Sequence, residues 1–141
     1  MYFDTAYLAK YYITEADSAD VRLLVERSLP ISTSQWVLAE FHSVLHRCVR
    51  QGGLSATDAR FLARTFASHV DTGMWKLLPV TEATLQRTGA RLLAAPVTLF
   101  LRAGDAVHLQ TASDAGEKEI WTNDRHMLAA ATHFGLRGRS I

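Results

Sequence analysis

The hydrophobic and polar positions divide the chain into short apolar runs and longer amphipathic stretches that alternate from one end to the other. A short apolar run is typical of a buried strand, and apolar residues spaced three and four apart are typical of a helix. The predicted strands cover residues 1–4, 30–33, 75–80 and 119–122, and residues 136–141 are compatible with a short edge strand. The predicted helices outside the middle of the chain cover residues 5–13, 18–28, 81–93, 105–115 and 124–134.

Two longer helices are predicted in the middle of the chain. Apolar residues at helical spacing from Val37 to Cys48 mark the first helix, which ends at Gly52. Ser55 is the expected N-cap of the second helix, which extends to Val70. The alternation of strands and helices predicts an α/β fold in which helices cover both faces of a parallel sheet.

Three aspartates come directly after predicted strands or begin predicted helices. Asp4 ends the first strand, Asp105 begins a helix, and Asp124 follows the fourth strand. The carboxyl ends of parallel strands meet at one edge of a sheet, where open α/β folds bind their ligands. Each aspartate also has a structural explanation, because Asp is a favoured N-cap and first-turn residue. The pattern alone leaves both interpretations open.

Glu40 lies inside the long helix, about two turns from its start, on the same side as Val37 and Val44. A carboxylate beside an apolar stripe must reach solvent, pair with a cation such as arginine, or become protonated. Its side chain is also long enough to reach the sheet edge that holds the three aspartates. Carboxylates gathered there would repel one another, so we expect Glu40→Gln to maintain or raise the stability of the metal-free protein.

A site made of Asp4, Glu40, Asp105 and Asp124 would suit Mg²⁺ or Mn²⁺, because hard divalent cations prefer carboxylate oxygens. A metal held in this way lowers the pKa of a bound water molecule and stabilises charge on a phosphoryl group. The sequence therefore predicts one metal site made of these four acids.

The neighbours of these acids are candidates for supporting roles. The polar residues that flank them and can hydrogen-bond to carboxylates or phosphate are Thr5, Thr122 and Asn123. Thr5 and Asn123 are also ordinary helix-start residues. We assign His108 to the core or to a supporting contact rather than to the metal. The arginines that would contact phosphates, or would simply be solvated, are Arg47, Arg50, Arg102 and Arg125.

Composition narrows the class of protein. The formal net charge is only +1, so any surface that binds nucleic acid must be local. The lone cysteine, Cys48, excludes an internal disulfide and a multi-cysteine zinc site. Met1 leads directly into strand-like residues, and no apolar run approaches the roughly 18 residues of a membrane span. We therefore expect a cytoplasmic protein with no signal peptide and no membrane partner.

The sequence resembles the PIN domain, and within that family the VapC-type toxins of bacterial toxin–antitoxin pairs. Four stretches in matching order carry the resemblance: FDTAYLAKYY, STSQWVLAEF, LRAGDAVHLQTA and WTNDRHML. Their intervals and the chain length also match, so the resemblance spans essentially the whole chain. It implies a single PIN domain over residues 1–141. The implied fold is a PIN-like three-layer α/β/α sandwich with a central, mostly parallel sheet of four or five strands.

The resemblance also implies an activity. It makes Asp4, Glu40, Asp105 and Asp124 the acidic site of an endoribonuclease that uses Mg²⁺ or Mn²⁺ and a metal-activated water to hydrolyse RNA. VapC-like proteins usually form homodimers and are inhibited by a cognate antitoxin whose C-terminal segment covers the site. Family knowledge thus implies three partners, namely an RNA substrate, an antitoxin and a second copy of the chain.

Two positions depart from the family pattern, and two other functions remain as alternatives. Gly104 stands where a larger residue is common, and Asn123 replaces a frequent aromatic residue, so substrate fit is open to change at both. The first alternative is a catalytically inactive PIN-like binding module. The second is a phosphoacceptor switch domain, which would need paired acids after the first strand, where Asp4 stands alone. Metal-dependent cleavage of RNA separates the endoribonuclease from both alternatives.

Overall fold

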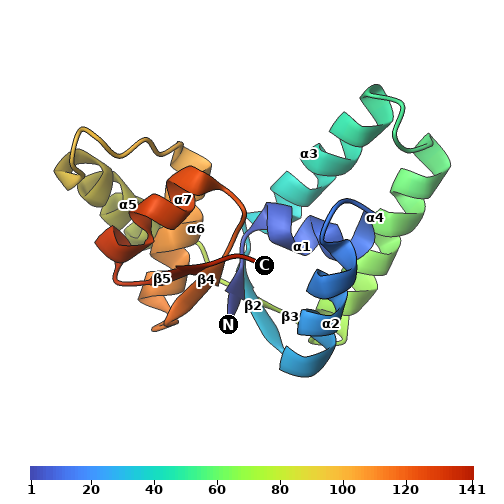
Figure 1. The fold of residues 1–141 in the computed structure, drawn as a ribbon, viewed down its shortest axis with the longest axis horizontal. Helices are drawn as coiled ribbons and strands as arrows, with labels where there is room; N and C mark the ends of the chain where they lie inside the picture. The colour runs from blue at the N-terminus through green and yellow to red at the C-terminus, as the bar shows by residue number, and fades with distance from the viewer.

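The computed structural model describes all 141 residues and consists of one five-stranded sheet between two groups of helices (Figure 1). The strands are β1 (Tyr2–Phe3), β2 (Ile31–Ser34), β3 (Trp75–Leu78), β4 (Glu119–Trp121) and β5 (Arg137–Arg139). The helices are α1 (Thr5–Tyr12), α2 (Ser18–Ser28), α3 (Val37–Arg50), α4 (Ala56–Asp71), α5 (Glu82–Ala94), α6 (Ala103–Asp114) and α7 (Arg125–Ala130), followed by the 3₁₀ turn η1 (Ala131–Phe134). Every strand and helix predicted from the sequence is present.

The sheet has the order β3-β2-β1-β4-β5, and all neighbouring strands are parallel. The central strand β1 pairs with β2 through Tyr2 and Ser32 and with β4 through Phe3 and Trp121. Because the strands are parallel, the segments that follow β1, β2 and β4 all leave the sheet at the same edge. The three-layer α/β/α sandwich predicted from the sequence is confirmed, with five strands in its sheet.

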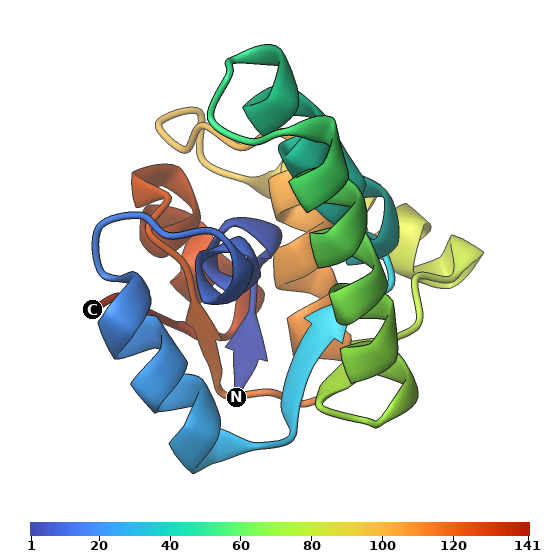
Figure 2. The same cartoon turned by 90° about the vertical axis from the view of Figure 1, so that its right-hand side faces the viewer.

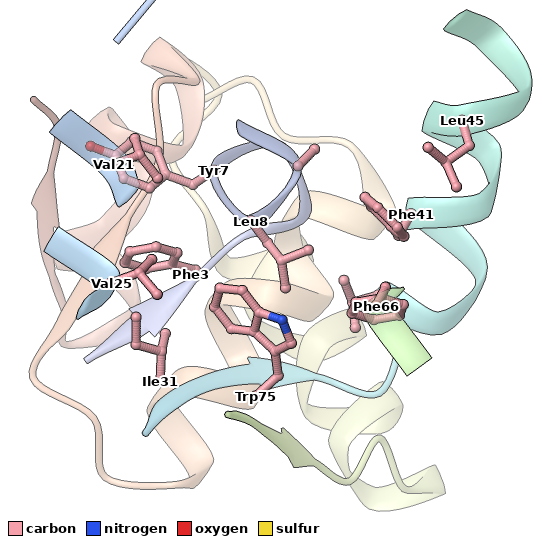
Figure 3. Packing of buried hydrophobic residues seen from close by; sticks show 12 residues of the cluster. Phe3, Tyr7, Leu8, Val21, Val25, Ile31, Phe41, Leu45, Phe66 and Trp75 are labelled. Atoms are coloured by element: carbon pink, nitrogen blue, oxygen red, sulfur yellow. The ribbon is translucent and has the colours of Figure 1, made fainter. Parts of the chain in front are cut away.

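The two residues of β1 serve opposite faces of the sheet, as the two-residue period of a strand requires. Phe3 joins a cluster with Ile31 and Trp75 under helices α1 to α4, and Figure 3 shows these side chains packed together. Helices α1 to α4 cover this face in Figure 2. Tyr2 joins the second cluster, with Ile120, under helices α6 and α7. Both faces of the sheet are therefore covered by helices, and the site must lie at an edge.

Helix α6 is enclosed on nearly all sides. Every residue from Ala106 to Ala112 is buried, which is typical of a helix with protein all around it. The sheet lies on one side of α6, and α5 and α7 lie on others (Figure 1). Its first turn, including Asp105, is thereby held in a fixed place beside the carboxyl edge of the sheet.

The structure corrects three predicted boundaries. Helix α3 begins at Val37, so Glu40 lies in its first turn rather than about two turns in. Helix α6 begins at Ala103, so Asp105 is its third residue and not its first. The last predicted helix, over residues 124–134, is α7 followed by the 3₁₀ turn η1. None of the helices is both long and apolar enough to span a membrane.

Candidate active site

A hollow of about 340 Å³ lies at the carboxyl edge of the central strands. Its charged and polar lining residues are Asp4, Thr5, Glu40, Ser43, Arg47, Arg102, Asp105, His108 and Asp124. All four predicted acids are therefore brought to one place from positions up to 120 residues apart. Nine of the twelve residues that line the hollow are polar or charged, an arrangement suited to charged ligands.

Asp4 ends β1 and is held from two sides. Its Oδ1 caps α1 by accepting a hydrogen bond from the backbone N–H of Tyr7 at 2.7 Å, and its Oδ2 accepts one from the Thr122 hydroxyl at 2.5 Å. The side chain is only 4% exposed. Burial raises the pKa of the Asp4 carboxyl group, and the hydrogen bond from Thr122 only partly offsets this. Asp4 is thus both a helix cap and part of the hollow.

Glu40 enters the hollow from the first turn of α3. Its Oε2 accepts a hydrogen bond from the Thr5 hydroxyl and lies 2.7 Å from Nε2 of His108. Burial acts to raise the pKa of Glu40, but the hydrogen bonds from His108 and Thr5 outweigh it and lower the pKa. The suggestion that an arginine pairs with Glu40 is therefore wrong, because the residue that faces its carboxylate is a histidine.

Asp105 does not cap its helix. The N-cap position of α6 is Arg102, whose side chain makes no capping bond, and Asp105 lies within the first turn as the third residue of the helix. Burial, followed by the nearby charge of Asp124, raises the pKa of the Asp105 carboxyl group. The charge of Asp105 is therefore poorly compensated within the protein, which helix capping would not explain.

Asp124 is a helix cap in addition to lining the hollow. Its Oδ1 accepts hydrogen bonds from the backbone N–H groups of His126 and Met127, at 2.7 and 3.0 Å. Both capping bonds use Oδ1, which leaves Oδ2 outside the cap. The residue is exposed, so its carboxylate is the most accessible of the four.

The three supporting residues have different placements. The Thr122 hydroxyl donates to Asp4 and accepts from the backbone N–H of Asp124 at 3.0 Å, so it ties the ends of β1 and β4 together. Thr5 contacts Glu40, as described above. Asn123 does not line the hollow, because its Oδ1 accepts a hydrogen bond from the Ser140 hydroxyl at 2.6 Å. Only the two threonines contact the acids directly.

His108 and Tyr2 form a network that sequence reasoning saw only in part. His108 is 2% exposed, and its Nδ1 lies 2.7 Å from the Tyr2 hydroxyl. His108 is buried with both ring nitrogens in polar contact, as expected for a satisfied core histidine, and its supporting role at the site stays a prediction. The contact with Tyr2 was not anticipated from the sequence. Ser43 was also missed as a lining residue, although it follows Glu40 by three positions and so shares its helix face. Of the four arginines considered for phosphate contacts, Arg47 and Arg102 line the hollow, and the other two do not.

Gly104 makes room for the carboxylate of Glu40. A Cβ atom at this position would lie 3.0 Å from Oε1 of Glu40 and 3.3 Å from Nε1 of Trp36. Gly104 stands where a larger residue is common in the family, and the carboxylate of Glu40 occupies the space that a larger side chain would need. Glu40 is confined on both sides, with Oε2 against His108 and Oε1 against Gly104.

We expect Gly104→Ala to reduce the activity of the site at least several-fold without weakening the fold. The new methyl group displaces Glu40, while replacing a helical glycine with alanine stabilises a helix by up to about 1 kcal/mol. Gly89→Ala in α5 is the matched control, because open space surrounds that position. Thermal melts and cleavage rates of both variants check this. Equal activity of the Gly104→Ala and Gly89→Ala proteins would show that the placement of Glu40 does not matter.

The chemistry of the hollow fits a hard divalent cation. Its acids are four carboxylates, whose oxygens are the ligands that Mg²⁺ and Mn²⁺ prefer. The raised pKa values of Asp4 and Asp105 mean that their negative charge is not fully compensated by the protein. As the side chains stand, no group of three or more His, Cys, Asp or Glu residues is arranged to hold a metal ion. Binding therefore requires carboxylates to turn toward one another, and Asp124 is the most exposed of them.

Comparisons with known proteins agree with this architecture. A model of the PIN domain family matches residues 1–132. No curated protein sequence matches the chain. The structure of VapC20 from Mycobacterium tuberculosis, described as a toxin that cleaves the sarcin–ricin loop, is 20% identical with a TM-score of 0.71, over 92% of this chain and 93% of that one. The structure of VapBC2 from Rickettsia felis, described as bound to a DNA fragment from its promoter, is 14% identical with a TM-score of 0.67, over 99% and 98%. At these identities the two structures establish a shared fold.

Proposed function

The chain belongs to the PIN domain family, and we propose that it is the toxin of a type II toxin–antitoxin system, a metal-dependent endoribonuclease that hydrolyses RNA phosphodiester bonds. The observation that carries the proposal is the convergence of Asp4, Glu40, Asp105 and Asp124 on one hollow at the carboxyl edge of the sheet. The likeness to VapC20, described as a toxin that cleaves the sarcin–ricin loop, supports the choice of RNA as substrate.

The same four acids would hold Mg²⁺ or Mn²⁺. A cation bound there would lower the pKa of a water molecule and stabilise negative charge on the phosphodiester. Two of the acids are already fixed, Asp4 by the Tyr7 N–H and the Thr122 hydroxyl, and Glu40 by its neighbours on α1 and α6. Ligands that are held before binding lose little freedom when they bind, so these two would define the place of the cation.

Two arginines are suited to hold the RNA. Arg47 of α3 and Arg102 at the start of α6 line the hollow. Guanidinium groups bind phosphate oxygens in a bidentate manner. Because the net charge of the chain is only +1, RNA binding requires a local group of cations, and these two arginines supply one. A phosphoacceptor switch domain typically also needs a lysine after its fifth strand, and the lining residues include no lysine.

The proposal includes the partners and the compartment expected for this class of toxin. The Rickettsia felis structure is named as VapBC2, which supports a cognate antitoxin as partner. We further propose that the chain acts as a homodimer in the cytoplasm, where an RNA substrate would be available.

We expect purified protein to cleave RNA with Mg²⁺ or Mn²⁺ and to stop when a chelator is added in excess, because in the proposed reaction the cation lowers the pKa of the attacking water. Restoring Mg²⁺ beyond the chelator should restore cleavage, which controls for loss of the fold. The products are followed by gel electrophoresis, and their 5′ ends are mapped in cellular RNA after the chain is induced. Undiminished cleavage in chelator would contradict metal dependence, and no cleavage under any condition would favour the inactive binding module.

A further inference from the structure

A buried relay of hydrogen bonds connects the first strand to the acidic site. The Tyr2 hydroxyl lies 2.7 Å from Nδ1 of His108, and Nε2 of His108 lies 2.7 Å from Oε2 of Glu40 and 3.0 Å from Oγ1 of Thr5. Tyr2 is fully buried and His108 is nearly so. The relay consists of Tyr2 of β1, His108 of α6 and Glu40 of α3, so it connects three of the elements that build the site.

The partners decide which nitrogen of His108 carries hydrogen. An ionised carboxylate can only accept, so the contact with Glu40 requires a hydrogen on Nε2. In a neutral imidazole, Nδ1 is then an acceptor, and the Tyr2 hydroxyl is the donor that faces it. The Thr5 hydroxyl also donates to Glu40. The hydroxyl of Tyr2 therefore favours the tautomer that presents a donor to Glu40.

We propose that Tyr2 and His108 are positioning residues for the divalent cation, because they hold the carboxylate of Glu40 in place before the cation binds. This inference rests on the proposed function. Neither residue contacts the cation or the RNA, and both act only through Glu40. Partners of this kind typically change metal affinity by about 10-fold to 100-fold when they are lost.

The confinement of Glu40 supports a positioning role rather than simple packing. His108 and Thr5 both contact the same oxygen, Oε2, while Oε1 lies in the space that Gly104 leaves open. The carboxylate is therefore fixed in orientation as well as in place. A histidine that only filled the core would need no polar contact with the site, and a core side chain of similar size would replace it.

The experiment measures Mn²⁺ affinity by titration calorimetry at neutral pH without RNA, on folded proteins checked by thermal melts. His108→Gln can keep an N–H donor toward Glu40, whereas His108→Met has similar length and no donor. We expect His108→Met to weaken Mn²⁺ binding about 10-fold or more and His108→Gln to retain most of the affinity. Tyr2→Phe removes a single hydroxyl, is the mildest of the three, and should weaken binding several-fold.

A double-mutant cycle tests whether Tyr2 acts through Glu40. In a Glu40→Gln background, Tyr2→Phe should cause no further loss of Mn²⁺ affinity. In an Asp124→Asn background it should keep its full effect, because Asp124 lies outside the relay. The inference is supported if Tyr2→Phe weakens Mn²⁺ binding in the Asp124→Asn background and has no effect in the Glu40→Gln background.

The other outcomes overturn it. Wild-type affinity in Tyr2→Phe and His108→Met, equal losses in His108→Gln and His108→Met, or tighter binding in any of them would each contradict a positioning role. Those results would leave the proposed function intact, provided that the wild-type protein binds Mn²⁺. A wild-type protein that binds no Mn²⁺ would overturn the proposed function and this inference together.

Discussion

Asp105→Asn is expected to reduce RNA cleavage by two orders of magnitude or more and to leave the fold at least as stable as that of the wild-type protein. Loss of a ligand charge weakens the hold on a cation that supplies several kcal/mol of transition-state stabilisation. At about 1.4 kcal/mol for each tenfold change in rate, a loss of about 3 kcal/mol corresponds to roughly a hundredfold. Expression of the variant should no longer inhibit growth.

The stability of the Asp105→Asn protein follows from the raised pKa of Asp105. Burial and the charge of Asp124 raise this pKa above the ordinary aspartate value of 3.8. The ionised carboxylate is therefore less favourable in the folded protein than in the unfolded chain, so the metal-free wild type gains stability as pH falls from neutral through the raised pKa. The Asp105→Asn protein does not gain stability in this way as pH falls. It has no charge at residue 105 to repel Asp124, so it is free of that repulsion already at neutral pH.

Asp20→Asn is a matched control for this variant. Asp20 is the third residue of α2, as Asp105 is of α6, but it does not line the hollow. Both variants lose the favourable effect of an acid on the helix dipole, which is worth about 0.3–1 kcal/mol. We expect Asp20→Asn to keep wild-type cleavage and to be the less stable of the two at neutral pH. Wild-type cleavage by Asp105→Asn would remove Asp105 from the site.

Much of the fold can be predicted from the sequence because most helices and strands are marked by residues within them. The apolar pair Tyr2 and Phe3 supplies both faces of the central strand, and the cap at Ser55 marks the start of α4, where its hydroxyl accepts from the Asp58 N–H. Parallel topology then follows from the alternation of strands and helices. The placement of Asp4 and Asp124 at one edge of the sheet is a consequence of that topology, because both follow parallel strands.

What the sequence could not supply depends on contacts between distant segments. The start of α3 is delayed because β2 stays paired with β3 through the Gln35 N–H, which donates to the Leu78 carbonyl at 2.8 Å. The spacing of apolar residues does not reveal that bond. The sequence therefore predicts Glu40 about two turns from the helix start, whereas it lies in the first turn. The same holds for His108, whose partners Tyr2 and Glu40 lie 106 and 68 residues away. Local sequence patterns therefore carry no sign of the contact between His108 and Glu40.

Glu40→Gln is expected to abolish most RNA cleavage and, unlike Asp105→Asn, to destabilise the metal-free protein. The sequence predicts maintained or higher stability because of repulsion among the acids, whereas the contacts of Glu40 in the structure lead us to expect the opposite. The hydrogen bonds from His108 and Thr5 outweigh burial and lower the pKa of Glu40, so the ionised form is favoured in the folded protein. Hydrogen bonds to a charged group contribute about 1 kcal/mol more than those to a neutral amide, which sets the size of the loss.

The pH dependence of this loss has a definite sign. A lowered pKa contributes stability that is present above the ordinary glutamate value of 4.5 and disappears as pH falls through the folded-state value. Urea unfolding of wild type and Glu40→Gln should therefore differ most at neutral pH and converge as pH falls below 4.5 and through the lowered folded-state pKa, the opposite of the trend for Asp105. Glu82→Gln, in the first turn of α5 and away from the hollow, is the control and should match wild type in cleavage. A Glu40→Gln protein as stable as Asp105→Asn at neutral pH would mean that repulsion among the acids, and not the contact with His108, governs Glu40.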